Sequence, residues 1–390
     1  MYPTLTDLLH DLLGFTLPLP IQTFGLFLVL SFAAAAYTLK LELKRMQHLG
    51  ILKSQQVTVE LNKPATGFDY FSATLFGFFI GYKILYALLN YADFAADPAA
   101  LILSKEGNLW LGIFCAAIGF YLRFRESKAD ELKGIETKNM EVNPYQHVGN
   151  ITMLAALVGV LGAKLFHILE NLGDFIAHPI DSIFSFSGLT FYGGLICAGA
   201  TVLYYANKKG IAPWRMFDAT APGLMLAYGV GRMGCHLSGD GDWGIVNLMP
   251  KPTWLAWAPD WLWAYGYPHN VVGDGVRMPD CEGPHCFELI PPVFPTPFYE
   301  FIMCCTLFFV LWCLRKHFKL VGVLTGVYLI LNGAERFLIE HIRVNNMLDF
   351  GFFSATQAEV ISFALMISGL VIIAYMVLVR KEKILSDKHD

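Results

Sequence analysis

The chain has 390 residues, of which 55% are hydrophobic and only 15% are charged, and its mean hydropathy is +0.49. Because a soluble domain usually carries about a quarter charged residues, this composition favours a membrane protein. The formal net charge of −4 is small and evenly spread along the chain, so nucleic acid is excluded as an expected partner.

Apolar stretches of roughly 18 or more residues recur along the chain, and each is long enough to cross a hydrocarbon core about 30 Å thick. The first 20 residues lack the basic start and the small-residue cleavage site of a signal peptide, so we expect a retained outer segment. We predict nine membrane spans, at residues 22–40, 69–91, 107–124, 149–169, 188–206, 217–237, 297–314, 320–341 and 357–379.

Lysine and arginine are distributed unevenly between the segments that separate these spans. Twenty of them lie in alternate segments, at 40–66, 123–147, 207–216, 315–320 and 380–390, whereas the segments on the other side hold 4. Because basic residues favour the cytoplasmic side, we expect the N-terminus outside the cytoplasm and the C-terminus inside.

Omitting the pair of spans at 69–124 leaves this alternation of charge unchanged. We therefore predict an all-helical integral membrane protein in which two transmembrane helices, at 69–124, are inserted into a seven-helix core. Residues 1–68 then form an outer segment, the first core helix and a cytoplasmic loop, and residues 125–390 hold the remaining core helices.

The longest outer loop, at about 238–296, is rich in Trp, Pro and Gly. It is either an interfacial anchor, because Trp favours the headgroup layer, or a cap over a site at the outer leaflet. Within it Cys281 and Cys286 flank Glu-Gly-Pro-His, and an oxidising compartment favours a disulfide between them. The intervening His285 leaves a metal site as the alternative.

Ionisable side chains inside membrane spans are costly and mark functional sites by default. At a rise of about 1.5 Å per residue, Arg232 lies roughly 25 Å above the cytoplasmic Arg215, near the outer leaflet. The same estimate brings further polar residues to this level, namely Lys164, Tyr192, Tyr299, Glu300, Arg336, Glu340 and Arg343. A guanidinium binds phosphate through a planar fork of donors, which indicates a lipid headgroup site. Structural ion pairs and snorkelling side chains are the alternative.

Arg232 lies among glycines and is followed by Cys235, His236, Asp240 and Asp242. Glycine allows a ligand or another backbone to approach closely, and it also serves plain helix packing. The Asp-Gly-Asp stretch predicts a turn at which a helix ends and carboxylates face a polar cavity.

Four stretches resemble, in order, the signatures of the bacterial prolipoprotein diacylglyceryl transferase family. Residues 231–244 begin Gly-Arg-Met-Gly and include Gly-Asp and Trp-Gly, as in the family's Gly-Arg-x-Gly-Asn-Phe-x-Asn-Gly-Glu-x-Trp-Gly. Residues 187–195, Ser-Gly-Leu-Thr-Phe-Tyr-Gly-Gly-Leu, are similar to its Gly-Gly-Met-Ser-Phe-His-Gly-Gly-Leu. Residues 295–300 and 336–343 are similar to its His-Pro-Ser-Gln-Leu-Tyr-Glu and Arg-x-x-x-Glu-x-x-Arg.

The resemblance covers roughly residues 20–40 and 149–380 and implies a seven-helix bacterial inner-membrane enzyme with its active site toward the outer leaflet. The implied reaction moves the diacylglyceryl group of phosphatidylglycerol to the thiol of a lipobox cysteine in a preprolipoprotein signal peptide. The products are a thioether and glycerol-1-phosphate. Phosphatidylglycerol, preprolipoproteins and membrane lipids are thus the expected partners, and we expect no cofactor and no metal.

The resemblance also suggests roles for individual residues. We expect Arg232 and Arg336 to clamp the lipid phosphate, and Glu340 to orient Arg336. Arg343 is expected at the rim of the site. Tyr192 is expected to hydrogen-bond a headgroup oxygen, since a phenol pKa near 10 handicaps it as a base.

Other residues complete the expected site. Asp240 and Asp242 are candidates to steer the thiol or the glycerol hydroxyls, and His236 is a candidate base or a structural helix-end histidine. The remaining residues expected to bind substrate are Lys164, Gly193, Gly194, Cys235, Tyr299 and Glu300.

The sequence departs from the family pattern at several positions. Tyr192 replaces the family's His, Cys235 replaces its Asn, and Lys164 replaces an Arg of the second core helix. The family's Glu corresponds to Asp240 or Asp242, with one residue inserted. The general base is therefore left open, and a transporter or lipid-binding scaffold, or another membrane transferase, remains the alternative.

Overall fold

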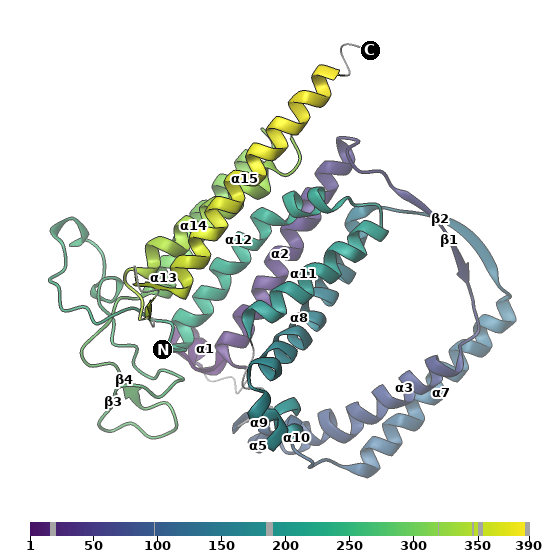
Figure 1. Cartoon of the computed structure of the whole chain (residues 1–390). Coiled ribbons are helices and arrows are strands. Elements are labelled where there is room, and N and C mark those ends of the chain that lie inside the picture. The colour runs from purple at the N-terminus through teal and green to yellow at the C-terminus, as the bar shows by residue number, and fades with distance from the viewer. Residues whose placement is uncertain are drawn as a thin grey trace.

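A computed structural model describes residues 1–15, 21–96, 98–184, 190–318, 320–344, 347–349 and 354–386. In these ranges each predicted span contains a helix (Figure 1). These helices are α2 (Thr23–His48), α3 (Gly67–Phe79) with η1 (Ile80–Leu85) and α4 (Tyr86–Leu89), α7 (Leu109–Lys133), α8 (Val148–Glu170), α11 (Phe191–Lys208), α12 (Pro213–Ser238), α13 (Thr296–Leu314), α14 (Val323–Glu340) and α15 (Gln357–Ser386). The predicted start of one span, at 188, and residues 187–189 of the family-like stretch lie outside the described residues.

Short elements connect these helices in the described parts of the chain. They include α1 (Leu5–Leu13), α5 (Tyr91–Ala96), α6 (Pro98–Leu103), α9 (Leu172–Ala177), α10 (Pro179–Phe184), η2 (Pro144–His147), η3 (Thr253–Leu255) and η4 (Asp260–Leu262). Three antiparallel two-stranded sheets pair β1 (Gln55–Leu61) with β2 (Glu136–Val142), β3 (Val276–Arg277) with β4 (Phe287–Glu288), and β5 (Met347–Asp349) with β6 (Ser354–Thr356).

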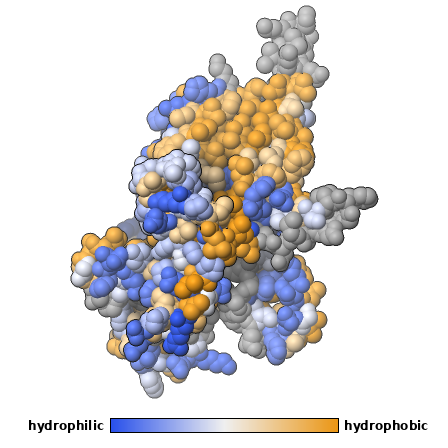
Figure 2. Space-filling view, turned by 90° about the vertical axis from the view of Figure 1, so that its left-hand side faces the viewer, coloured by the Kyte–Doolittle hydropathy of each residue, from blue (hydrophilic) through white to orange (hydrophobic). Residues whose placement is uncertain are grey.

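Five helical segments in the described parts of the chain are long and apolar enough to cross a membrane. They are Thr23–His48, Gly67–Leu89, Pro144–Glu170, Thr296–Leu314 and Gln357–Leu378. The exposed side of α15 is apolar, as at Phe363 and Val371, and Figure 2 shows a broad apolar surface over the upper part of the molecule. The chain is therefore a helical membrane protein.

Helix α12 lies at the centre of the core, where it packs along α2 and α13, while α14 pairs with α15 and α8 with α11 (Figure 1). Small residues allow these approaches. A Cβ atom added at Gly229 of α12 would lie 2.9 Å from the Cβ of Cys304, and one added at Gly234 would lie 2.7 Å from the Cβ of Phe27. Two glycines near Arg232 thus serve helix packing.

Helices α3 and α7 form a hairpin that lies apart from the core (Figure 1). They pack on each other through glycine, because a Cβ atom added at Gly77 would lie 2.5 Å from the Cys115 carbonyl oxygen. The β1–β2 ribbon joins the hairpin to the core in a continuous antiparallel register, from Gln55↔Val142 to Leu61↔Glu136. At the base of the ribbon, the Ser54 hydroxyl lies 3.0 Å from the side-chain oxygen of Asn143.

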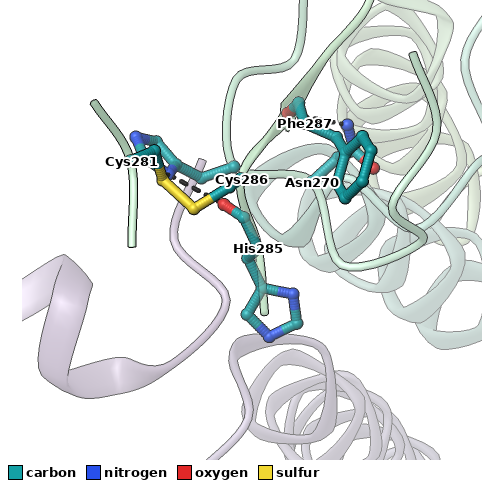
Figure 3. The surroundings of a disulfide bond; sticks show 6 residues. Asn270, Cys281, His285, Cys286 and Phe287 are labelled. Atoms are coloured by element: carbon teal, nitrogen blue, oxygen red, sulfur yellow. Dashed lines mark hydrogen bonds between the residues drawn. A yellow bond between two sulfur atoms is a disulfide. The ribbon is translucent and has the colours of Figure 1, made fainter. Parts of the chain in front are cut away.

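The loop at 239–295 lies near the N-terminus, at what we call the loop end of the core (Figure 1). Trp254 and Trp257 are largely exposed, whereas Tyr267 is fully buried. Cys281 and Cys286 form a disulfide, and the ring of the intervening His285 points away from it (Figure 3). Both sulfur atoms are thus bonded and cannot serve as thiolate ligands.

The opposite end of the core contains a buried ion-pair network. Glu42 of α2 is 1% exposed and receives Arg45 at 2.5 Å and Arg315, which follows α13, at 2.9 Å. Since Arg315 and Glu42 are distant in sequence, this network connects α2 to α13 at that end.

Helix α14 is held at its start by a buried carboxylate of α12. Asp218 accepts hydrogen bonds from the backbone N–H groups of Gly322, at 2.6 Å, and Thr325, at 2.9 Å. The Thr325 hydroxyl donates a third. These bonds satisfy N–H groups that a helix start leaves without an internal partner.

We expect Asp218→Ala to lower the free energy of unfolding by about 1–3 kcal/mol, because buried donors of α14 lose a charged acceptor. Thermal unfolding of the purified full chain in detergent measures the effect. Asp260→Ala is the control, since the side chain of Asp260 is 96% exposed and pairs with Lys251, and such pairs contribute little. Equal melting temperatures for the two variants would contradict the proposed capping role.

Candidate functional site

Three arginines converge on one buried carboxylate at the loop end of the core. Arg232 lies near the end of α12, Arg336 lies in α14 and Arg343 follows α14. Glu300, near the start of α13, is 0% exposed. Its Oε2 atom lies 2.5 Å from the Nε of Arg232. Its Oε1 atom lies 3.3 Å from the Nη1 of Arg336 and 3.2 Å from the Nη1 of Arg343.

A second carboxylate, that of Asp242, bridges two of these arginines. Its Oδ2 atom pairs with Arg232, and its Oδ1 atom lies 2.6 Å from the Nη2 of Arg343. Gly239 ends α12 with a φ of +66°, and Gly241 has a φ of +96°. Backbone at positive φ suits glycine, so these two residues allow the chain to turn and direct Asp242 back toward the helix end.

Backbone contacts hold the end of α14 against the start of the loop. The Ile245 N–H donates to the Ile342 carbonyl at 2.9 Å, and Gly244 and Arg343 form a β-bridge. Within α14 the Arg336 Nη2 atom lies 3.0 Å from Glu340, four residues later. Arg336 and Glu340 thus form an ion pair within one helix.

The network pairs three arginines with three carboxylates, those of Asp242, Glu300 and Glu340. The three arginines are partly accessible: the side chain of Arg232 is 17% exposed, that of Arg336 is 23% exposed and that of Arg343 is 9% exposed. The Nε of Arg343 is buried and has no hydrogen-bond partner within the described ranges. A guanidinium has five donors, and Arg232 and Arg336 are partly exposed, so these two residues retain donor capacity for an added anion.

The two aspartates beyond α12 differ in their electrostatic surroundings. Burial raises the pKa of Asp240, and the neighbouring charge of Asp242 raises it further. Burial also acts to raise the pKa of Asp242, but the positive charges of Arg232 and Arg343 outweigh it and lower that pKa below its usual value. Asp242 is thus the carboxylate that the arginines hold ionised.

Cys235 joins the network, whereas two other expected residues contribute to packing. The buried Cys235 Sγ lies 4.0 Å from the Nη1 of Arg232. His236 Nδ1 lies 3.1 Å from the Tyr267 hydroxyl, within a cluster of aromatic rings. Tyr299 donates its hydroxyl hydrogen to the Leu262 carbonyl at 2.6 Å. His236 and Tyr299 therefore hold the loop against the core.

The remaining expected residues lie in the α8–α11 pair. Gly193 and Gly194 of α11 face α8, where a Cβ added at Gly194 would lie 2.9 Å from the Gly159 carbonyl oxygen. Lys164 is half-buried in α8, and Tyr192 is 41% exposed and contacts the ring of Phe191. The glycines thus have a packing role, because they allow α8 and α11 to approach closely.

Sequence reasoning missed two residues of this region. The Arg232 guanidinium lies over the ring of Tyr228, 5.2 Å from its centroid, a cation–π contact. The four-residue spacing along α12 could have indicated it. Glu335, next to Arg336, is 2% exposed, and its oxygens have no hydrogen-bond partner in the part of the chain that the structure describes. In the sequence, only its position directly before Arg336 could have indicated that Glu335 lies near the site.

Comparison with known proteins gives consistent matches. Residues 110–375 match the family described as prolipoprotein diacylglyceryl transferase. A phosphatidylglycerol–prolipoprotein diacylglyceryl transferase of Clostridioides difficile is 28% identical over 292 residues, covering 74% of this chain and 97% of the relative. A protein of the same name from Thermus thermophilus is 28% identical over 245 residues, covering 59% of this chain and 82% of the relative.

We expect Glu300→Gln to lower the free energy of unfolding by about 3–5 kcal/mol, because it leaves buried arginines with less compensating charge. Tyr299→Phe, at the adjacent position, should cost only about 0.5–1.5 kcal/mol for one lost hydrogen bond. Thermal unfolding of the detergent-solubilised chain compares the two. If Glu300→Gln melts no lower than Tyr299→Phe, Glu300 is not the residue on which the network depends.

Proposed function

The chain belongs to the prolipoprotein diacylglyceryl transferase family, and we propose that it transfers the diacylglyceryl group of phosphatidylglycerol to a lipobox cysteine of preprolipoproteins. The observation that carries the residue assignment is the convergence of Arg232 and Arg336 on Glu300. Membership in a transferase family argues against the transporter and lipid-scaffold alternatives.

Arg232 and Arg336 are the proposed clamp for the donor's phosphate. Both contact the same carboxylate with only part of their donors, and a phosphate oxygen is the same kind of acceptor as a carboxylate oxygen. Their partial exposure leaves a side from which an anion can approach. Arg343, which is more buried, supports the clamp through Glu300 and Asp242.

The reaction needs stabilisation of the leaving group. The acceptor's thiol gives up its proton to water, its sulfur forms a bond to the terminal glycerol carbon of the diacylglyceryl group, and the bond from that carbon to the phosphate oxygen breaks. The electron pair of the broken bond stays on glycerol-1-phosphate, whose negative charge therefore increases. Preorganised guanidinium groups that meet this developing charge lower the barrier.

The substrates set the orientation of the protein in the membrane. We propose that the loop end faces the outer side of the bacterial inner membrane, where phosphatidylglycerol headgroups and the lipobox cysteine are both accessible. The basic segments at 40–66, 123–147 and 207–216 then lie in the cytoplasm. This arrangement has the N-terminus outside and the C-terminus inside.

We further propose that the α3–α7 hairpin is an insertion in a seven-helix core. The β1–β2 ribbon begins at Gln55 and ends at Val142, which are paired residues. The chain therefore leaves the core and returns to it at one point. Helices α2 and α8, on either side of this point, still contact each other.

Arg232→Ala and Arg336→Ala should each lower transfer by about 10²-fold or more, because each removes a fixed donor from the developing phosphate charge. The assay follows the mass increase of a lipobox peptide incubated with phosphatidylglycerol vesicles and the purified chain. Arg277→Ala is the matched control, since Arg277 is an exposed residue of β3 outside the network. Wild-type rates for either Arg232→Ala or Arg336→Ala would refute the clamp.

Removing residues 55–142 and joining Ser54 to Asn143 through a short glycine linker should leave a folded chain that still transfers lipid. The reason is that the ribbon closes on itself next to the Ser54–Asn143 contact. Membrane insertion, melting temperature and the peptide assay test this variant. A shortened chain that folds but has lost transfer would show that the hairpin belongs to the catalytic unit.

A further inference from the structure

A cavity of about 320 Å³ lies between α2 and the start of α8, at the end of the core opposite the loop end (Figure 1). Its lining comes from the second half of α2, from η2 and from the first turn of α8, and includes Tyr37, Lys40, Tyr145, Gln146 and Gly149. None of these residues belongs to the arginine network. The cavity is therefore separate from the proposed donor site.

Two lysines of α2, one helical turn apart, give this cavity a positive charge. Lys40 lines the cavity and is exposed. The Lys44 ammonium lies 5.0 Å from the ring centroid of Tyr145, which also lines the cavity. Within the described ranges neither lysine forms an ion pair, because the acid between them, Glu42, is buried and pairs with two arginines instead. The cavity thus suits an anion.

Both lysines lie at the depth of lipid headgroups. Helix α2 begins at the loop end with Thr23, and Lys40 and Lys44 lie about 25 Å and about 31 Å further along the helix. The hydrocarbon core of a bilayer is about 30 Å thick. In the proposed orientation the two ammonium groups are therefore at the cytoplasmic boundary of the hydrocarbon. Tyr37, which is 64% exposed, is of the residue type that favours this interface.

Exposed apolar side chains lead from the cavity toward the loop end. On α8, Gly149 is followed at four-residue spacing by Met153 and Leu157, which are 55% and 59% exposed, and such residues share one face of a helix. On α2, Leu30 and Tyr37 are two turns apart and also exposed. A phospholipid headgroup in the cavity would therefore place its acyl chains against apolar surface, which inorganic phosphate could not use.

Glycine leaves space on the α8 side of the cavity. A Cβ atom added at Gly149 would meet no atom within 4 Å, whereas one added at Gly194, where α11 packs on α8, would lie 2.9 Å from the Gly159 carbonyl oxygen. Gly149 therefore does not serve helix packing. A larger side chain at this position would occupy the cavity without displacing a neighbouring helix.

We propose that this cavity binds the phosphate headgroup of an anionic phospholipid of the cytoplasmic leaflet, with Lys40 and Lys44 as its cationic partners. Basic pockets between transmembrane helices on the cytoplasmic side suit such headgroups. The lipid fills the boundary between α2 and α8, where contacts between the two helices are sparse. The inference goes beyond the proposed function and takes from it only the orientation of the chain in the membrane.

Photo-crosslinking locates the lipid on the full chain in detergent. The chain is mixed with phosphatidylglycerol that carries a diazirine next to its headgroup, irradiated, digested with pepsin and analysed by mass spectrometry. We expect labelled peptides from residues 36–44 and 145–153, in addition to those from the loop end, where the proposed donor site lies. Labelling confined to the loop end would overturn this proposal and leave the proposed function intact.

Replacing both lysines tests the charge. Lys40→Gln combined with Lys44→Gln should lower labelling of α2 and α8 by about 25-fold, since each lysine near an anionic headgroup contributes about fivefold. Lys208→Gln is the matched control, because Lys208 also lies over a tyrosine ring, 4.6 Å from the centroid of Tyr204, but does not line the cavity. Equal labelling of the wild type and the double variant would contradict the proposed binding site.

Filling the cavity tests the site without changing its charge. Gly149→Leu should lower labelling of α2 and α8 by about fivefold or more, because the new side chain occupies the space of the headgroup and one lysine's contact is lost with it. Gly199→Leu on α11 is its control, since a Cβ atom at Gly199 also meets no atom within 4 Å. Wild-type labelling of Gly149→Leu would place the lipid elsewhere.

Two further probes identify the ligand. A phosphatidylcholine carrying the same diazirine should label α2 and α8 much less, and equal labelling would overturn the preference for an anionic lipid. Millimolar inorganic phosphate should displace little of the phosphatidylglycerol label, and full displacement would show a site for free phosphate instead. A chain that is labelled at α2 and α8 but transfers no lipid to a lipobox peptide supports this site and contradicts the proposed function.

Discussion

One buried carboxylate, Glu300, is the interaction on which the loop end of the core depends. Three guanidinium groups from α12, α14 and the segment after it would repel one another in a medium with little water. Glu300 contacts all three at full burial, and Asp242 contacts two of them. The helices must therefore meet at this point, because separating them would leave charges unpaired near the membrane.

Helix packing brings these charges to the same place. Gly229 and Gly234 allow α12 to lie close to α13 and α2, and Asp218 fixes the start of α14. The position of Arg336 along α14 is thus set about three to four turns away from where Asp218 anchors the helix. Small residues and a cap, neither of which touches the site, determine whether the arginines converge.

The sequence was sufficient to predict the helices, because apolar length is a local property, and the rise per residue also predicted how far along its helix each charge lies. Depth says nothing about lateral position, however. Tyr192 and Lys164 were expected at the same level as Arg232, but they belong to the α8–α11 pair, while the ion-pair network lies among α12, α13 and α14. The central place of Glu300 and the grouping around Cys235 depend on side-chain direction and a glycine turn, which no periodicity reveals.

The ion pairs of Glu42 have a consequence for how a lipid could reach the arginines. Glu42, Arg45 and Arg315 fasten α2 to α13 at one end, while Glu300 fastens α12 to α13 and α14 at the other. These ion pairs connect α2, α12, α13 and α14 at both ends of the bundle, so separating these helices from one another is unfavourable. If the proposed donor enters sideways from the bilayer, we expect it at the boundary between this bundle and the α8–α11 pair, because contacts across that boundary are sparse.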